Sequence, residues 1–195
     1  MLTVSLVIVL TTGAAVSILE TYHRELPDAQ REDGESDREV RGLARLVQVS
    51  ADYTMVDLTL RGVAPGTYRA TIREFGDLKD GATSAGPVWN GYSGQDQPGP
   101  GAEARGVIGT VEIGKDGRGS VFMTKPVKVW EIIGHAMVVS RQDEQDGAPL
   151  QNDENTVVGV IARSAGVWDN DKTVCSCTGK TLWEERKDEV KKGML

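Results

Sequence analysis

The chain has 195 residues, of which 39% are hydrophobic and 26% are charged, and its net charge is −7. This length accommodates one globular domain with extensions. The acidic balance argues against a nucleic-acid partner, because binding to phosphates needs a clustered lysine and arginine surface. The only two cysteines are Cys175 and Cys177, so no disulfide can cross-link the residues before them. A reducing compartment is therefore favoured.

The first 19 residues contain no charged side chain. Their length is that of a short membrane span or of the core of a signal peptide. Basic residues normally precede a signal core, and none does so here. We therefore expect a β-strand at 15–19 behind a variable leader at 1–13. A membrane-anchored or exported form is ranked lower, and no membrane partner is expected.

The middle of the chain alternates apolar and polar residues with the period of two that half-buried strands show. Such runs cover 42–50, 53–61, 67–75, 106–113, 119–124, 135–140 and 156–163. The short turn Ser50-Ala-Asp predicts that the first two of these runs form an antiparallel hairpin. Glycine-rich or polar stretches at 22–41, 76–105 and 141–155 are expected to be loops, and no helix is predicted.

This spacing of short strands is typical of an all-β protein, either a sandwich or a Greek-key barrel. We place this β domain at 14–167. The segment 168–195 has a different character, because it holds both cysteines and the charged run Glu184-Glu-Arg-Lys. It is expected to be a flexible C-terminal tail.

Four motifs resemble the Cu/Zn superoxide dismutase fold. They are Arg73-Glu-Phe-Gly-Asp-Leu, Ala82-Thr-Ser-Ala-Gly-Pro, Ile132-Ile-Gly-His-Ala-Met-Val-Val and Gly159-Val-Ile-Ala. The chain then continues as Arg163-Ser-Ala-Gly-Val-Trp and, further on, Val174-Cys-Ser-Cys-Thr-Gly-Lys-Thr-Leu-Trp-Glu-Glu-Arg, which is similar to the tail of the copper chaperones for that enzyme. Ala15-Val-Ser-Ile-Leu-Glu-Thr and Arg41-Gly-Leu-Ala-Arg-Leu-Val-Gln-Val resemble the fungal branch of those chaperones. The resemblance covers residues 14–187.

The resemblance to the dismutase implies a set of histidines that hold copper, since imidazole suits this metal. Matching the motifs residue by residue places other side chains at these positions: Thr71, Arg73, Val88 and Ser140. The chain's two histidines, His23 and His135, match no ligand position. An active dismutase, the first competing hypothesis, is therefore excluded, and we expect a β domain without a catalytic metal.

Two further family features are also missing from the sequence. The dismutase's internal disulfide is implied at positions that here carry Ala82 and Val158. The chaperone family begins with a metal-binding domain that carries a Met-x-Cys-x-x-Cys loop. No cysteine precedes Cys175, so we expect that domain to be absent or replaced by residues 1–13.

The pair Cys175 and Cys177 can bind a soft metal ion. In an extended backbone, residues two apart point to the same side, with Cα atoms about 6–7 Å apart. Two thiolates suit Cu(I), whereas a structural zinc ion wants four ligands that the chain does not offer. A disulfide across one intervening residue would be strained and easily exchanged. Lys172 and Lys180 would favour the thiolate forms.

The resemblance implies a copper chaperone that docks onto Cu/Zn superoxide dismutase as a heterodimer. It would deliver Cu(I) and promote disulfide formation in the enzyme through Cys175 and Cys177. A homodimer of the free chain is the alternative assembly. The competing hypothesis is a catalytically silent interaction module, or a fragment, without copper delivery of its own.

The expected partner interface includes Arg163, Trp168 and Trp183. A docking patch is expected at 159–162, together with Ala44 and Leu46. The predicted location is the cytoplasm, with the mitochondrial intermembrane space as a second compartment.

Overall fold

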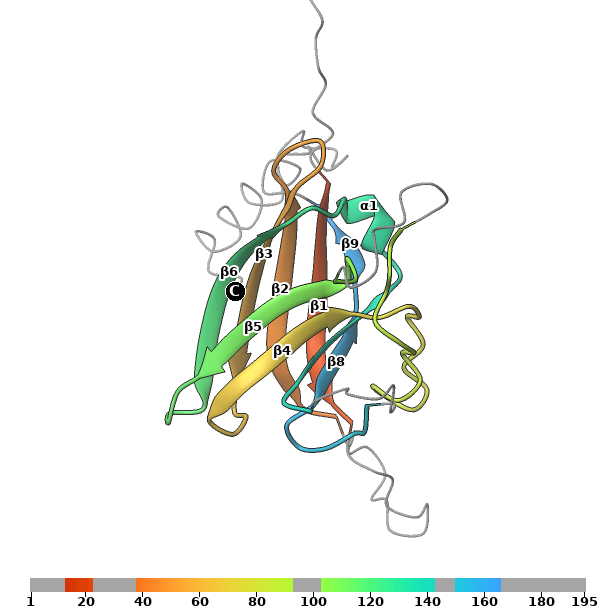
Figure 1. Ribbon diagram of the computed structural model, residues 1–195. Coiled ribbons are helices and arrows are strands. Elements are labelled where there is room, and N and C mark those ends of the chain that lie inside the picture. The colour runs from red at the N-terminus through yellow and green to blue at the C-terminus, as the bar shows by residue number, and fades with distance from the viewer. Residues whose placement is uncertain (1–12, 23–37, 93–102, 143–149, 166–195) are drawn as a thin grey trace, which may run out of the picture. The chain divides into compact units, whose positions relative to one another are not determined.

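The computed structural model describes residues 13–22, 38–92, 103–142 and 150–165. The chain divides into two units between Ser164 and Ala165, and the fold described here is that of the first unit. The strands are β1 Ala14–Thr21, β2 Val40–Gln48, β3 Thr54–Arg61, β4 Gly66–Ile72, β5 Val107–Ile113, β6 Arg118–Lys125, β7 Ala136–Ser140, β8 Val157–Val160 and β9 Ala162–Ser164 (Figure 1). The helix α1, Val129–Ile132, has only four residues.

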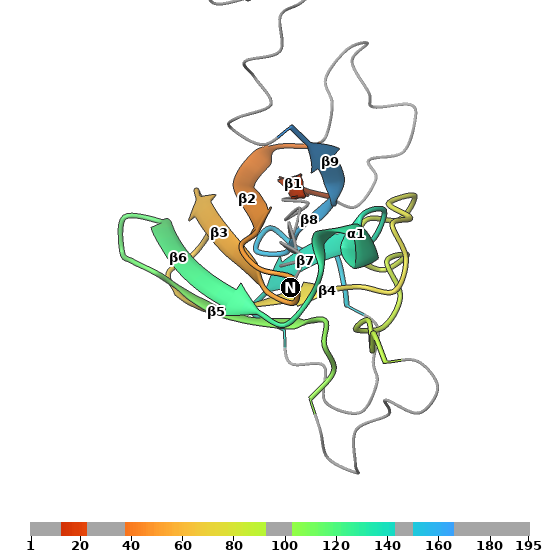
Figure 2. The ribbon, with the colours of Figure 1, turned by 90° about the horizontal axis from the view of Figure 1, so that it is seen from above.

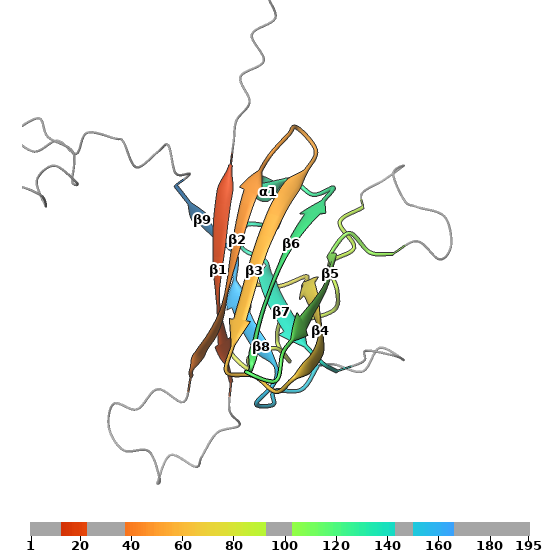
Figure 3. The ribbon, with the colours of Figure 1, turned by 90° about the vertical axis from the view of Figure 1, so that its left-hand side faces the viewer.

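The strands form one antiparallel sheet in the order β5-β4-β7-β8-β1-β2-β3-β6, with β9 paired to β1. The sheet curls into two layers, with β1, β2, β3 and β6 in one and β4, β5, β7 and β8 in the other (Figure 3). Seen from above, the strands lie around a ring (Figure 2). A tight turn, in which the Gly114 N–H donates to the Arg118 carbonyl at 2.9 Å, joins the two end strands β5 and β6. The predicted all-β barrel is confirmed.

The core follows from the alternation along the strands. Ala44 and Leu46 of β2 lie opposite Leu58 and Val56 of β3, and all four side chains are fully buried. Alternate residues of a strand point to opposite faces, so the residues between them face outward. Burying each large aliphatic side chain contributes about 1.5–3 kcal/mol. One continuous apolar core therefore fills the barrel.

Most of the expected strands and the hairpin of β2 with β3 are confirmed. Several strand bounds differ by one to three residues from those expected, and two differences change the pattern of elements. β2 begins at Val40, inside the expected loop, and the last expected strand divides into β8 and β9. The division arises because the Ile161 N–H donates to the His135 carbonyl at 2.8 Å, away from β1.

The helix α1 was not predicted, because four residues are too few to show a helical period. The Glu131 carboxylate accepts a hydrogen bond from the Lys128 backbone N–H at 2.9 Å and so closes the first turn. Within the described ranges, no helix has the length and hydropathy needed to cross a bilayer.

Arg105 ties the long loop after β4 to this helix. Its guanidinium donates to Glu131 Oε2 at 2.7 Å, to the Gly91 carbonyl at 2.6 Å and to the Pro126 carbonyl at 3.0 Å. It also lies 5.2 Å from the centre of the Trp89 ring, within the range of a cation–π contact. The two ends of the loop, at 89–92 and 103–106, are thus held together at the barrel.

We expect Glu131→Gln to lower stability in a pH-dependent way. Burial raises the pKa of Glu131, but the hydrogen bonds from Arg105 and Lys128 outweigh burial, so this pKa lies below its usual range. The ion pair therefore stabilises the fold above the unfolded pKa of about 4.3, and this contribution is lost as pH falls through the lower folded value. Melting curves should show a deficit of about 1 kcal/mol at pH 7 that disappears as acidification passes the lowered folded pKa of Glu131.

The matched control is Glu103→Gln, because Glu103 is exposed and lies 3.9 Å from Arg69. This variant should melt like the unchanged protein throughout. A deficit in Glu131→Gln that stayed constant across the pH range would contradict the role assigned to the carboxylate.

Candidate functional site

Three of the four positions that match the dismutase's copper ligands lie together at the end of β4, and the fourth, Ser140, pairs with Arg69 of the same strand. Thr71 is in β4, Arg73 follows the strand, and Val88 pairs with Arg73 in an isolated bridge. The Arg73 Nη1 lies 3.5 Å from Thr71 Oγ1. Ser140, at the end of the neighbouring strand β7, shares a hydrogen bond of 2.9 Å with Thr156 Oγ1.

These side chains do not fit a copper or zinc ion. A guanidinium is permanently charged and can only donate hydrogen bonds, so Arg73 cannot be a ligand. Val88 has no donor atom, and the hydroxyls of Thr71 and Ser140 are poor partners for either metal. Across the described ranges, no cluster of three or more histidine, cysteine or acidic side chains could hold a metal ion.

His135 takes part in the packing of the same region. Its Nδ1 lies 2.8 Å from the Arg73 carbonyl oxygen, and its ring centre lies 5.3 Å from that of Trp89. The imidazole therefore bonds the main chain and packs against an indole. His23 lies outside the described residues.

The two positions that match the dismutase's disulfide also meet in space. Ala82 and Val158 are buried in the same small apolar cluster. Its other members are Tyr22, Ala85, Ala136, Val138 and Leu150. Van der Waals contact within this cluster therefore takes the place of a covalent bond.

Of the predicted site residues, the structure describes Arg163. Arg163 is exposed on β9, opposite Ala15 of β1. The four others, Trp168, Cys175, Cys177 and Trp183, lie outside the described residues, so the dithiol site remains a prediction.

The expectation that Ala44 and Leu46 form a docking patch is wrong. Both side chains are completely buried in the barrel core. The segment 159–162 is accessible only in part, because Gly159 and Ile161 are buried, Val160 is half-buried and Ala162 is exposed. The error has a simple cause: the period of two was recognised, but the inner face of β2 was taken for the outer one.

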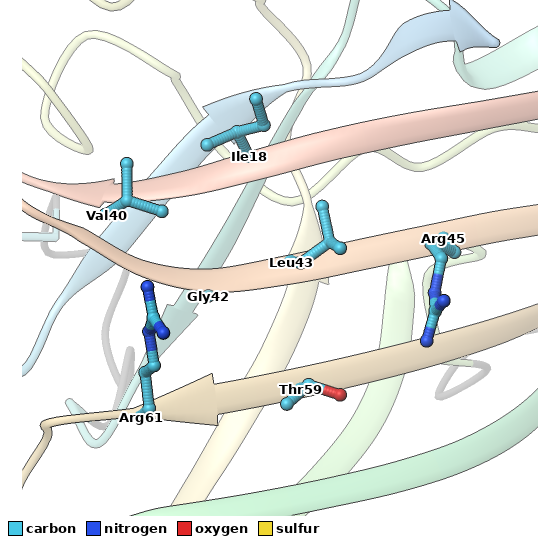
Figure 4. Close-up of a pocket in the computed structure, with 7 residues that line it drawn as sticks. All are labelled: Ile18, Val40, Gly42, Leu43, Arg45, Thr59 and Arg61. Atoms are coloured by element: carbon cyan, nitrogen blue, oxygen red, sulfur yellow. The ribbon is translucent and has the colours of Figure 1, made fainter. Parts of the chain in front are cut away.

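The outward residues of the same strands form an exposed apolar surface. Ile18 of β1 lies directly opposite Leu43 of β2, and their side chains are 53% and 37% exposed. With Val40, which is 44% exposed, they line an open pocket whose remaining wall is Gly42, Arg45, Thr59 and Arg61 (Figure 4). Figure 4 shows Ile18, Val40 and Leu43 standing out from the two strands.

This surface continues across β8 to the loop after β4. A Cβ atom built on Gly159 would collide with the Ile18 carbonyl oxygen, so β8 and β1 touch through their main chains. A Cβ on Gly76 would collide with the Gly134 carbonyl and lie 3.7 Å from Val160 Cγ1. Glycine inside a strand often marks such an approach.

Phe75, which precedes Gly76, is 53% exposed and completes the surface. We call Ile18, Val40, Leu43, Phe75 and Val160 the apolar face. Sequence reasoning missed four of these residues. Their signal was the outward half of the alternation, where large apolar side chains replace the usual polar ones.

Residues 40–164 match the family model of copper/zinc superoxide dismutase. The chain belongs to this family. It is 40% identical to the superoxide dismutase 1 copper chaperone of Saccharomyces cerevisiae over 179 residues, which are 90% of this chain and 66% of the relative. It is 38% identical to the chloroplastic/cytosolic copper chaperone for superoxide dismutase of Arabidopsis thaliana, over 75% of this chain and 43% of the relative.

The copper chaperone for superoxide dismutase of Homo sapiens is 33% identical, over 75% of this chain and 57% of the relative. The chain thus spans about two thirds of the length of its fungal relative and less of the others. The resemblance to fungal copper chaperones that the sequence motifs indicate is confirmed. In this member of the dismutase family, the residues at the copper ligand positions cannot bind the metal.

Proposed function

We propose that this chain is a copper chaperone for Cu/Zn superoxide dismutase and is not itself an enzyme. The observation that carries the proposal is a contrast between the outer surface of the barrel and its copper ligand positions. The dismutase fold and an exposed apolar face are present, while the side chains at the ligand positions do not suit a metal. The names of the relatives support the same conclusion.

The apolar face is the proposed docking surface. The two subunits of a symmetric homodimer bury the same surface patch. A related chain that carries this patch can replace one subunit and so form a heterodimer. An apolar centre with a charged border is the usual make-up of a protein interface. Here the border includes the ion pair of Arg45 with Asp57 at 2.5 Å, together with Arg61. Arg163, on the strand next to β1, extends it.

The copper itself is proposed to travel on Cys175 and Cys177. Two thiolates are soft ligands and suit Cu(I) as a cargo. Low coordination leaves the ion open to attack by a further ligand of the enzyme, so transfer can proceed by ligand exchange. Trp168 and Trp183 flank the dithiol in sequence and are proposed to contact the partner, since tryptophan is enriched in interfaces.

The same cysteines, once free of copper, are proposed to oxidise the enzyme's cysteine pair. A thiolate of the enzyme attacks one sulfur of a Cys175–Cys177 disulfide, and a mixed disulfide forms as the other sulfur leaves as a thiolate. The enzyme's second thiolate then attacks the mixed disulfide, leaving the enzyme oxidised and this chain reduced by two electrons. Dioxygen or another thiol oxidant must restore the disulfide. We place this activity in the cytoplasm and the mitochondrial intermembrane space.

Leu43→Glu should weaken docking. A carboxylate buried in the apolar face would lose its hydration without a partner, and at least ~30-fold in affinity, or about 2 kcal/mol, should be lost. Calorimetric titration with copper-free dismutase measures this change. Thr110→Glu adds the same charge on the exposed side of β5, outside the apolar face, and should bind normally. Equal binding by both variants would contradict the assignment of the surface.

Replacing both Cys175 and Cys177 with serine should abolish activation and leave docking within about twofold of the unchanged protein, because serine keeps the shape but is a poor ligand for Cu(I). The measurement is superoxide dismutation after Cu(I)-loaded chain is mixed with copper-free enzyme. Normal activation by the double variant would contradict the dithiol assignment. If the unchanged chain, with both cysteines, bound the copper-free enzyme but never activated it, the result would support the silent interaction module instead.

A further inference from the structure

Arg73 is one of the largest fully buried side chains of the barrel, with 2% of its surface exposed. Removing a guanidinium from water is costly unless its N–H groups are satisfied. Its Nε and Nη2 both donate to the Gly86 carbonyl oxygen, at 2.9 and 2.6 Å. One carbonyl in the loop after β4 thus receives two charge-assisted hydrogen bonds, which are stronger than neutral ones.

The residue held in this way supports the apolar face. Gly86 has a φ of +77°, which favours glycine. A Cβ atom at this position would lie 2.5 Å from Phe75 Cδ2, so the Phe75 ring covers Gly86. The Phe75 N–H donates to the Ala85 carbonyl at 3.0 Å, and the Glu74 N–H donates to the Pro87 carbonyl at 2.9 Å. Contacts therefore lead from Arg73 through Gly86 to the exposed Phe75.

The other anchors of this loop also need neither metal nor sulfur. The side chain of Asn152 accepts from the Ala82 N–H at 2.8 Å and donates to the Asp80 carbonyl at 2.8 Å. Thr83 Oγ1 donates to the Leu150 carbonyl at 3.0 Å. Where the family resemblance implies a histidine ligand and a cysteine, the chain has Arg73 and the buried Ala82.

We propose that Arg73 is a positioning residue that replaces the missing metal as the cationic anchor of residues 74–88. The dismutase-docking surface is consequently formed in the metal-free, fully reduced chain. A chaperone organised in this way can recognise its partner before any metal or disulfide is present on either side. This inference rests on the proposed function for its partner, but the clamp itself is a property of the free protein.

The test compares Arg73→Met and Arg73→Lys with the unchanged full chain, in chelator and reductant. Hydrogen exchange followed by NMR reports the Glu74 and Phe75 amides, and calorimetry reports binding of copper-free dismutase. In the unchanged chain both amides should be protected from exchange, and addition of zinc should not increase this protection. Arg73→Met should lose at least ~tenfold in protection and in affinity, the size expected for one charge-assisted hydrogen bond.

Arg73→Lys keeps the charge and much of the volume, so it should fold even if Arg73→Met does not. It should lose part of the amide protection, because an ammonium group cannot donate two hydrogen bonds in the forked geometry of a guanidinium. Arg69 is an exposed arginine of β4, the strand that precedes Arg73, so Arg69→Met is the matched control and should change neither readout. Full protection in both Arg73 variants, or protection that appears only after zinc or oxidation, would overturn the proposal. If the unchanged chain did not bind dismutase, the proposed function would fail, and exchange alone would still decide the clamp.

Discussion

The paired hydrogen bonds from the Arg73 guanidinium to the Gly86 carbonyl are the constraint on which the proposed docking surface depends. A dismutase-like barrel carries a long loop after β4, and such a loop needs an anchor to the sheet. A metal ion can supply a fixed positive charge for that purpose. Arg73 supplies a fixed positive charge through a side chain, and the loop keeps its backbone partners at Ala85 and Pro87. The loop can therefore keep its conformation without a bound metal ion.

Main-chain contacts complete the same surface. Gly159 lies against the Ile18 carbonyl and Gly76 against the Gly134 carbonyl, in each case with no room for a Cβ atom. These contacts hold β1, β8 and the loop after β4 close together. Apolar side chains that are distant in sequence therefore lie on one continuous surface. The chain thus carries the proposed docking surface on a barrel whose copper ligand positions no longer suit the metal. The proposed dithiol of Cys175 and Cys177 would then supply the chemistry from a segment that follows the β domain in the sequence.

Much of the fold could be predicted because alternation with a period of two marks strands directly, and the hairpin of β2 with β3 was placed by its short turn. It was harder to predict which face of each strand points into the core. In β2, Ala44 and Leu46 lie on one face and Leu43 on the other, and all three are apolar. The sequence alone therefore does not tell which of the two faces points into the core. The histidine replacements could be read by matching motifs, but the Gly86 partner of Arg73 could not. That contact joins residues on opposite sides of a loop, and no periodicity records it.

We propose that copper binds to Cys175 and Cys177 and not to side chains of the barrel. X-ray absorption spectroscopy of the full chain loaded with one equivalent of Cu(I) tests it most directly, because sulfur and imidazole nitrogen scatter differently. We expect a shell of sulfur ligands only, contributed by Cys175 and Cys177. Imidazole scattering from His23 or His135 would place copper on another part of the chain and contradict the dithiol site.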